Sequence, residues 1–172
     1  MLIFPWLSHW LAALLLIGMA TFALLEAKSA SLIPKSLFLW PLMGLLYGLM
    51  ALASQISRGT PPPSKSILLV MGVAMTLCSL QALLVNIRKI SRWPSGAIWL
   101  SLVLLAMVCQ TPYAGAEEPV FHTFFRRLSG FVWAAIGITK VVSEKTVTQE
   151  GGIPAWIILL YVQAALIASS PH

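Results

Sequence analysis

The chain has 172 residues, of which 59% are hydrophobic and only 9% are charged, and it contains no aspartate. A soluble domain of this length needs a charged exterior, so the composition indicates an integral membrane protein. The net charge is +6, but the basic residues lie singly or in small groups in short loops, which is typical of topology signals and lipid contacts. We therefore expect membrane lipids as partners and no nucleic acid.

Six apolar runs, each about long enough to cross a bilayer, predict an all-α polytopic transmembrane helical bundle. A barrel would instead show ~10-residue segments of alternating polarity. We expect a single integral membrane domain over residues 1–172, with five spans as the alternative to six. The expected spans cover about residues 4–25, 37–54, 66–86, 95–112, 120–142 and 153–170.

The first run, from Phe4 to Leu25, is uninterrupted. The alternative to a transmembrane helix is a cleaved signal peptide, with Ala27 and Ser29 as the small residues before the cut. However, no Lys or Arg precedes the run, and it is longer than the apolar core of about 7–15 residues in a signal peptide. We therefore expect this helix to be retained.

Glycines at helical spacing occur in two of the runs. The second run contains Gly44 and Gly48, and the fifth contains Gly130 and Gly137 on one face with Ala134. Small residues at this spacing let two helices approach closely in a membrane. The pattern predicts contacts with other membrane helices through Gly44, Gly48, Gly130 and Gly137.

The fifth run is the least regular, because only the dozen residues Leu128–Thr139 are free of charge. To cross a bilayer, its helix must let Arg126, Arg127 and Lys140 extend toward the interfaces. The alternative is an amphipathic helix in the plane of the interface, which would leave five spans. Arg126 and Arg127 could also hold a lipid headgroup, although we favour a charge anchor that sets the depth of the helix.

The basic residues predict the orientation. If side A is the side with the N-terminus, the loops on side B carry seven (Lys28, Lys35, Arg88, Lys89, Arg92, Lys140 and Lys145) and those on side A four (Arg58, Lys65, Arg126 and Arg127). Cytoplasmic loops carry the excess of Lys and Arg. Side B is therefore expected to be cytoplasmic and the N-terminus extracytoplasmic or lumenal.

Two histidines, His9 and His122, open the first and fifth runs. Both runs cross from side A to side B, so the imidazoles are expected at a similar depth, as a b-type haem bound within a helical bundle requires. Glu117 and Glu118 precede His122 by five and four residues and could bind a cation or act with it as acid and base. We favour the simpler interpretation of interfacial histidines beside a solvated loop. No set of residues predicts a metal site.

No acidic residue falls deep in a run, which argues against proton-coupled transport, and no catalytic motif is present. The sequence thus favours a non-enzymatic accessory, assembly or interaction component of a membrane. One alternative is a redox or lipid-modifying enzyme that uses His9, His122, Glu117 and Glu118 at side A. The other is a small carrier for a neutral or lipidic solute, which needs no charge at the midplane.

The expected orientation predicts the accessibility of two loops. A cysteine introduced at Thr60 should react with an impermeant reagent added outside, whereas one in the Arg88–Arg92 turn should be protected. Labelling of intact cells or sealed vesicles measures both. The opposite pattern would reverse the orientation.

Overall fold

The computed structural model describes residues 5–29, 36–57, 62–87, 120–145 and 152–169. These ranges contain five α-helices and no strand, so the prediction of an all-helical chain is confirmed for them. The helices are α1 Pro5–Ser29, α2 Ser36–Ser57, α3 Pro62–Asn86, α5 Val120–Lys145 and α6 Ala155–Ser169. Each of them overlaps one of the expected ranges, and the fourth expected range, 95–112, lies outside the described residues.

Long apolar segments run through α1, α2, α3 and α6 but differ in length. By length and composition alone, the segment His9–Lys28 of α1 is able to cross a membrane. The segments Phe38–Ala53, Gly72–Asn86 and Ala155–Ser169 are apolar but shorter.

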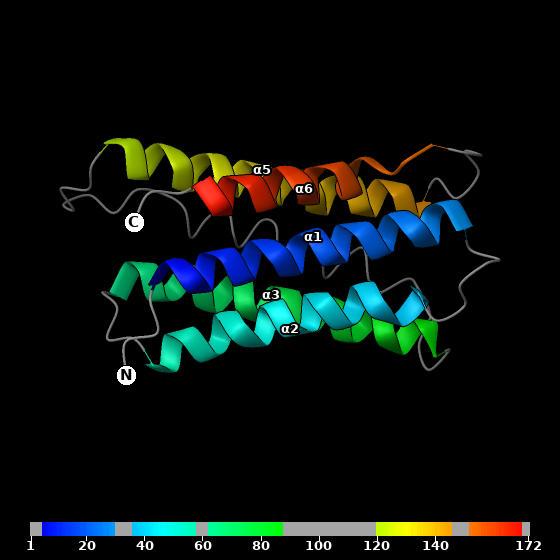
Figure 1. The fold of residues 1–172 in the computed structure, drawn as a ribbon, viewed down its shortest axis with the longest axis horizontal. Helices are drawn as coiled ribbons and strands as arrows, with labels where there is room; N and C mark the ends of the chain where they lie inside the picture. The colour runs from blue at the N-terminus through cyan, green and yellow to red at the C-terminus, as the bar shows by residue number, and fades with distance from the viewer. Residues whose placement is uncertain (1–4, 30–35, 58–61, 88–119, 146–151, 170–172) are drawn as a thin grey trace.

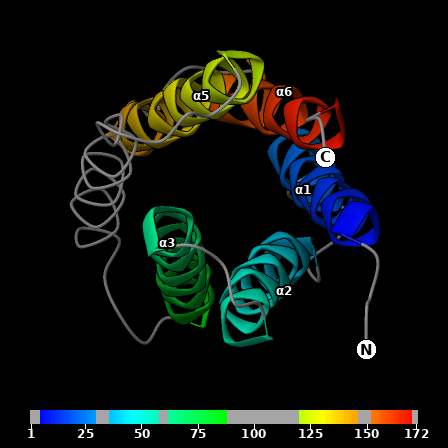
Figure 2. The ribbon, with the colours of Figure 1, turned by 90° about the vertical axis from the view of Figure 1, so that its left-hand side faces the viewer.

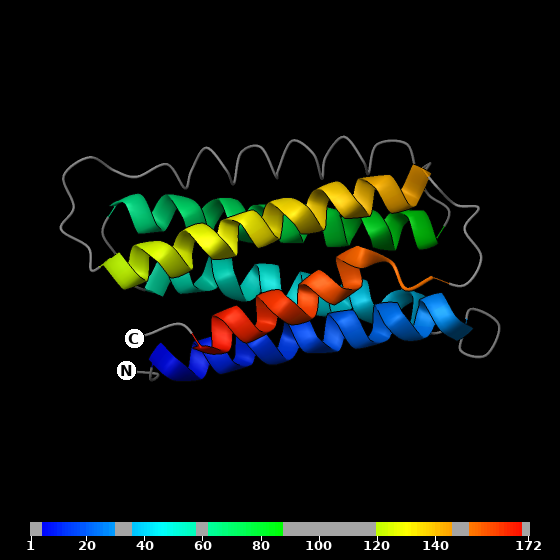
Figure 3. The same cartoon turned by 90° about the horizontal axis from the view of Figure 1, so that it is seen from above.

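The five helices lie along one common direction (Figure 1), and helices that are neighbours in the bundle run in opposite senses. Among them, α3 packs on α2, α2 on α1, α1 on α6 and α6 on α5. Viewed from the end, α3, α2, α1, α6 and α5 therefore follow one another around an arc (Figure 2). Seen from above, α1 and α6 run side by side in opposite directions (Figure 3). The starts of α1, α3 and α5 all lie at one end of the bundle (Figure 1), which we call end A, and the opposite end is end B.

The closest approach of two backbones is between α2 and α3. A Cβ atom at Gly48 would lie 2.5 Å from Thr76 Oγ1 and 2.7 Å from the Thr76 backbone nitrogen. A Cβ at Gly44 would overlap the hydroxyl of Ser79. Gly72 of α3 is less tight, because its Cβ would lie 2.9 Å from Leu52 Cγ and 3.1 Å from the carbonyl oxygen of Gly48. These two helices can pack at this distance only because glycine has no side chain.

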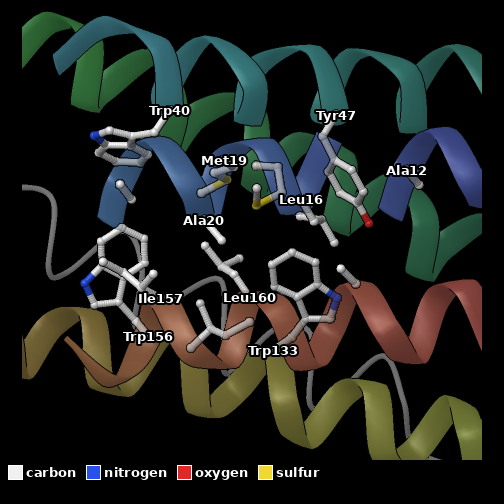
Figure 4. Packing of buried hydrophobic residues seen from close by; sticks show 14 of the residues in the cluster. Ala12, Leu16, Met19, Ala20, Trp40, Tyr47, Trp133, Trp156, Ile157 and Leu160 are labelled. Carbon is white, nitrogen blue, oxygen red and sulfur yellow. The ribbon is translucent and has the colours of Figure 1, made fainter. Parts of the chain in front are cut away.

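Aromatic rings fill the inner side of the arc. They lie between helices that face each other without close backbone contact. The rings of Trp40 and Trp156 lie 5.7 Å apart, and those of Tyr47 and Trp133 lie 6.0 Å apart. Figure 4 shows these two pairs joining α2 to α6 and α5, with Leu16 of α1 among the residues packed between them. Offset and tilted ring pairs of this kind stabilise a core beyond the area that they bury.

The glycine contact generates a prediction for Gly48→Leu. The new side chain must push the α3 backbone away, so we expect the free energy of unfolding to fall by about 1–3 kcal/mol. Leu46→Val is the matched control, because Leu46 is exposed on the same helix and its substitution should have little effect. Unfolding of the detergent-purified variants measures both. Equal midpoints for the two variants would contradict the tight α2–α3 contact.

Candidate functional site

The residues that the sequence singled out at side A belong to two helices that begin at the same end. His9 is partly buried near the start of α1, and His122 falls in the first turn of α5. Glu117 and Glu118 precede α5 and lie outside the described residues. In the end view, α6 lies between α1 and α5 (Figure 2), and both pack on it. A ligand shared by His9 and His122 therefore stays a prediction.

The structure describes part of two further groups of predicted residues, the arginine pair and the glycines of α5. Arg127 is exposed on α5, and its neighbour Arg126 lies in the same helix. Gly130 and Gly137 are buried on α5. Within the described ranges, no three His, Cys or Glu side chains come together as a metal site would require. Contacts of the glycines with helices of another protein stay a prediction.

A polar network between α5 and α6 was not predicted. The side chain of Gln163 on α6 is completely buried, with 0% exposed. We orient its amide so that Oε1 accepts hydrogen bonds from Trp133 Nε1 at 2.9 Å and Ser129 Oγ at 2.6 Å. The amide nitrogen then donates to the Ser129 carbonyl oxygen at 3.2 Å. The opposite orientation keeps only the 2.6 Å bond to the Ser129 hydroxyl, and buried polar atoms are normally all satisfied.

The other side of α6 is joined to α1 through hydroxyl groups. Thr21 Oγ1 donates to the carbonyl oxygen of Ile17 at 2.8 Å. The hydroxyl of Tyr161, 2.8 Å from the same Thr21 oxygen, is then the donor in the contact between the two helices. Helix α6 is therefore hydrogen-bonded to both of its described neighbours, by Tyr161 to α1 and by Gln163 to α5.

A cation lies between two tryptophans at end B. The Lys140 ammonium is 4.3 Å from the ring centroid of Trp156 and 5.1 Å from that of Trp40. Both indoles are buried, and attraction of a cation by the face of an indole is strongest where water is excluded. This box, made of Lys140, Trp40 and Trp156, ties α5 to α2 and α6. The sequence predicted that Lys140 extends toward an interface but did not indicate that it meets the two tryptophans.

One buried polar side chain has a different environment. Gln81 on α3 is 5% exposed, and neither its amide nitrogen nor its amide oxygen has a hydrogen-bond partner. An unsatisfied buried amide destabilises a fold by about 1–3 kcal/mol. Gln81 is thus the polar group in the described core whose hydrogen-bonding capacity is not used.

Most of the polar groups in the described interior connect helices. Gln163, Ser129, Thr21 and Tyr161 each bond a neighbouring helix. Side chains that are engaged in this way hold helices in register. Comparison with protein-family models, with curated proteins and with solved structures found no match to this chain.

Two leucine substitutions compare the hydrogen-bonded amide of Gln163 with the unpartnered amide of Gln81. Gln163→Leu leaves Trp133 Nε1 and the Ser129 hydroxyl without their partner, so the free energy of unfolding should fall by about 1 kcal/mol. Gln81→Leu breaks no hydrogen bond and should be neutral or stabilising. Both are read from the unfolding midpoint in detergent. If Gln81→Leu destabilises as much as Gln163→Leu, the Gln81 amide has a partner.

Proposed function

We propose that this chain is a multi-pass membrane protein of about six spans that works as a non-enzymatic accessory, assembly or interaction component of its membrane. Its N-terminus lies on the extracytoplasmic or lumenal side. The observation that carries the membrane assignment is the exposure of large apolar side chains on all five helices. The observation that carries the functional class is the use of the interior polar groups.

Large apolar side chains point outward from all five helices. The exposed ones include Leu14 and Ile17 on α1, Leu42, Leu46 and Leu49 on α2, Leu69, Val73 and Leu77 on α3, Phe131 and Ile138 on α5, and Ile158 and Val162 on α6. A soluble protein rarely exposes continuous apolar surface on every element. Hydrocarbon accommodates such a surface at no cost.

Small and polar side chains lie inward beside the large aromatic and aliphatic side chains of the core. The buried set includes Ala12, Ala13, Ala20 and Ala23 of α1, Gly44, Gly48 and Ala51 of α2, Ser79 and Gln81 of α3, and Gln163 and Ala164 of α6. In a bilayer, helix association depends on close packing of small residues and on hydrogen bonds between helices, because burial of apolar surface gives no advantage over lipid. The inward faces fit this requirement.

The packing of α5 supports a crossing helix over an interfacial one. Helix α5 lies alongside α6 (Figures 1 and 2) and is bonded to it through Ser129 and Trp133. Lys140 further along α5 contacts Trp40 and Trp156. A helix in the plane of the interface would have to give up these contacts. If α6 crosses, α5 therefore crosses with it.

The interior polar groups support a structural role. Two or more helices are joined by each of Gln163, Tyr161 and Lys140. A protein that offers a surface to a partner needs its helices held in fixed positions in this way. A carrier or an enzyme would need interior polar groups directed at a substrate, and among the buried polar side chains that the structure describes Gln81 is the one whose amide has no hydrogen-bond partner. The proposal therefore assigns these groups to stability and the function to association within the membrane.

Experiments on membranes, on solubilised membranes and on purified protein test the membrane assignment and the functional class. We expect the chain to resist alkaline carbonate extraction and to migrate on native gels, after mild solubilisation at native expression levels, in a stoichiometric complex with another membrane protein. His9→Ala and His122→Ala should each leave that complex and the expression level intact. A Soret band or a stoichiometric metal, lost in either single variant, would contradict the non-enzymatic assignment. Release by carbonate would contradict the membrane assignment.

A further inference from the structure

Arg127 is an exposed cation on an otherwise apolar face of α5. Phe124 and Phe131 lie three residues before and four after it, which places all three on one side of a helix. The two phenylalanines are 56% and 65% exposed. Ile138 and Val142 continue the same face and are also exposed. The guanidinium is therefore attached to the surface that faces lipid in the proposed arrangement.

The position of Arg127 along the helix is too deep for an ordinary interfacial residue. Lys140 lies at end B beside Trp40 and Trp156, near the starts of α2 and α6, where interfacial tryptophans are expected. Arg127 is 13 residues earlier (140 − 127), or ~20 Å along the axis at 1.5 Å per residue. The hydrocarbon layer is ~30 Å thick. With Lys140 at one boundary, Arg127 lies ~10 Å inside the other.

Helices α1 and α2 carry no cation at a comparable depth from end A. Helix α2, Ser36–Ser57, contains no charged residue over its 22 residues, and the charge-free part of α1 runs from Pro5 to Leu25. On α5, Lys140 is directed between two indoles, so Arg127 alone of these two cations is placed on the lipid-facing side. Of α1, α2 and α5, α5 is thus the one that carries a cation inside its apolar length near end A.

We propose that Arg127 binds the phosphate of an anionic phospholipid that is drawn against α5, with Phe124 and Phe131 contacting the lipid above and below the phosphate. The inference rests on the membrane embedding proposed above. A cation below the interface is stabilised by extension toward the surface and by local thinning that brings a headgroup to it. A guanidinium matches a phosphate with two parallel hydrogen bonds.

The chemistry favours an anionic lipid over a zwitterionic one. A phosphatidylcholine headgroup would bring its own quaternary ammonium close to the guanidinium, whereas phosphatidylglycerol adds no second positive charge. Free phosphate is a poorer occupant, because the flanking phenyl rings offer an apolar surface that only the lipid's glycerol and acyl groups can cover.

The test uses the full chain in nanodiscs made of equal amounts of phosphatidylglycerol and phosphatidylcholine. After extraction and partial delipidation, native mass spectrometry measures the ratio of the two lipids that stay bound. We expect the wild type to retain phosphatidylglycerol preferentially, and Arg127→Gln to lower that ratio about fivefold, the effect of one basic residue near the surface. Arg127→Lys should keep most of the preference because it keeps the charge.

The control is Lys28→Gln, which removes the same charge from the last turn of α1 at end B. It should leave the retained lipid unchanged, and an equal loss in both variants would mean that net charge alone sets the preference, which overturns the proposal. Displacement of the lipid by millimolar inorganic phosphate would also overturn it. A chain that enters nanodiscs but shows no dependence on Arg127 refutes this site alone. A chain that does not enter them refutes the membrane embedding as well.

Discussion

The hydrogen bonds on the two sides of α6 are the interactions on which the described bundle depends. Tyr161 joins α6 to Thr21 of α1, and Gln163 joins it to Ser129 and Trp133 of α5. Among the described helices, α6 is the one that connects α5 to the remaining three. Without it, α5 would meet the others only through aromatic and cation–π contacts such as Tyr47 with Trp133. A helix of 15 residues thus fixes the register of a much longer neighbour.

A second constraint acts on the opposite side of the arc. There α2 and α3 approach so closely that a methyl group at Gly48 would meet the Thr76 backbone. The two halves of the described bundle therefore depend on different contacts. Glycine packing joins α2 to α3, and polar contacts join α6 to its neighbours. Both mechanisms operate when the surroundings are as apolar as the side chains. The inward faces accordingly combine small and polar residues with large aromatic and aliphatic ones, while further leucines and phenylalanines point outward.

The helices were predictable because the length of an apolar run is a local property. The glycine pair in α2 was predictable for the same reason, since two residues four apart indicate a close approach. The opposing surface of Gly72, Thr76 and Ser79 was not, because the sequence does not say which helix lies opposite. Gln163 and Ser129 are 34 residues apart in the chain, and Trp40 is a hundred residues from Lys140. Such pairs carry no periodic signal. The candidate site at side A remains a prediction, since Glu117 and Glu118 lie outside the described residues.

Helix α5 shows how the same type of charge can be handled in two ways on one helix. Lys140 is on the face shared with Trp133, and its ammonium is placed between two buried indoles that replace part of its hydration. Arg127 is on the opposite, outward side, where it is exposed and its flanking residues are exposed phenyl rings. The protein stabilises the inward charge with its own side chains. The outward charge has to be stabilised by what surrounds the bundle, and in a bilayer the group with the matching charge is the lipid phosphate.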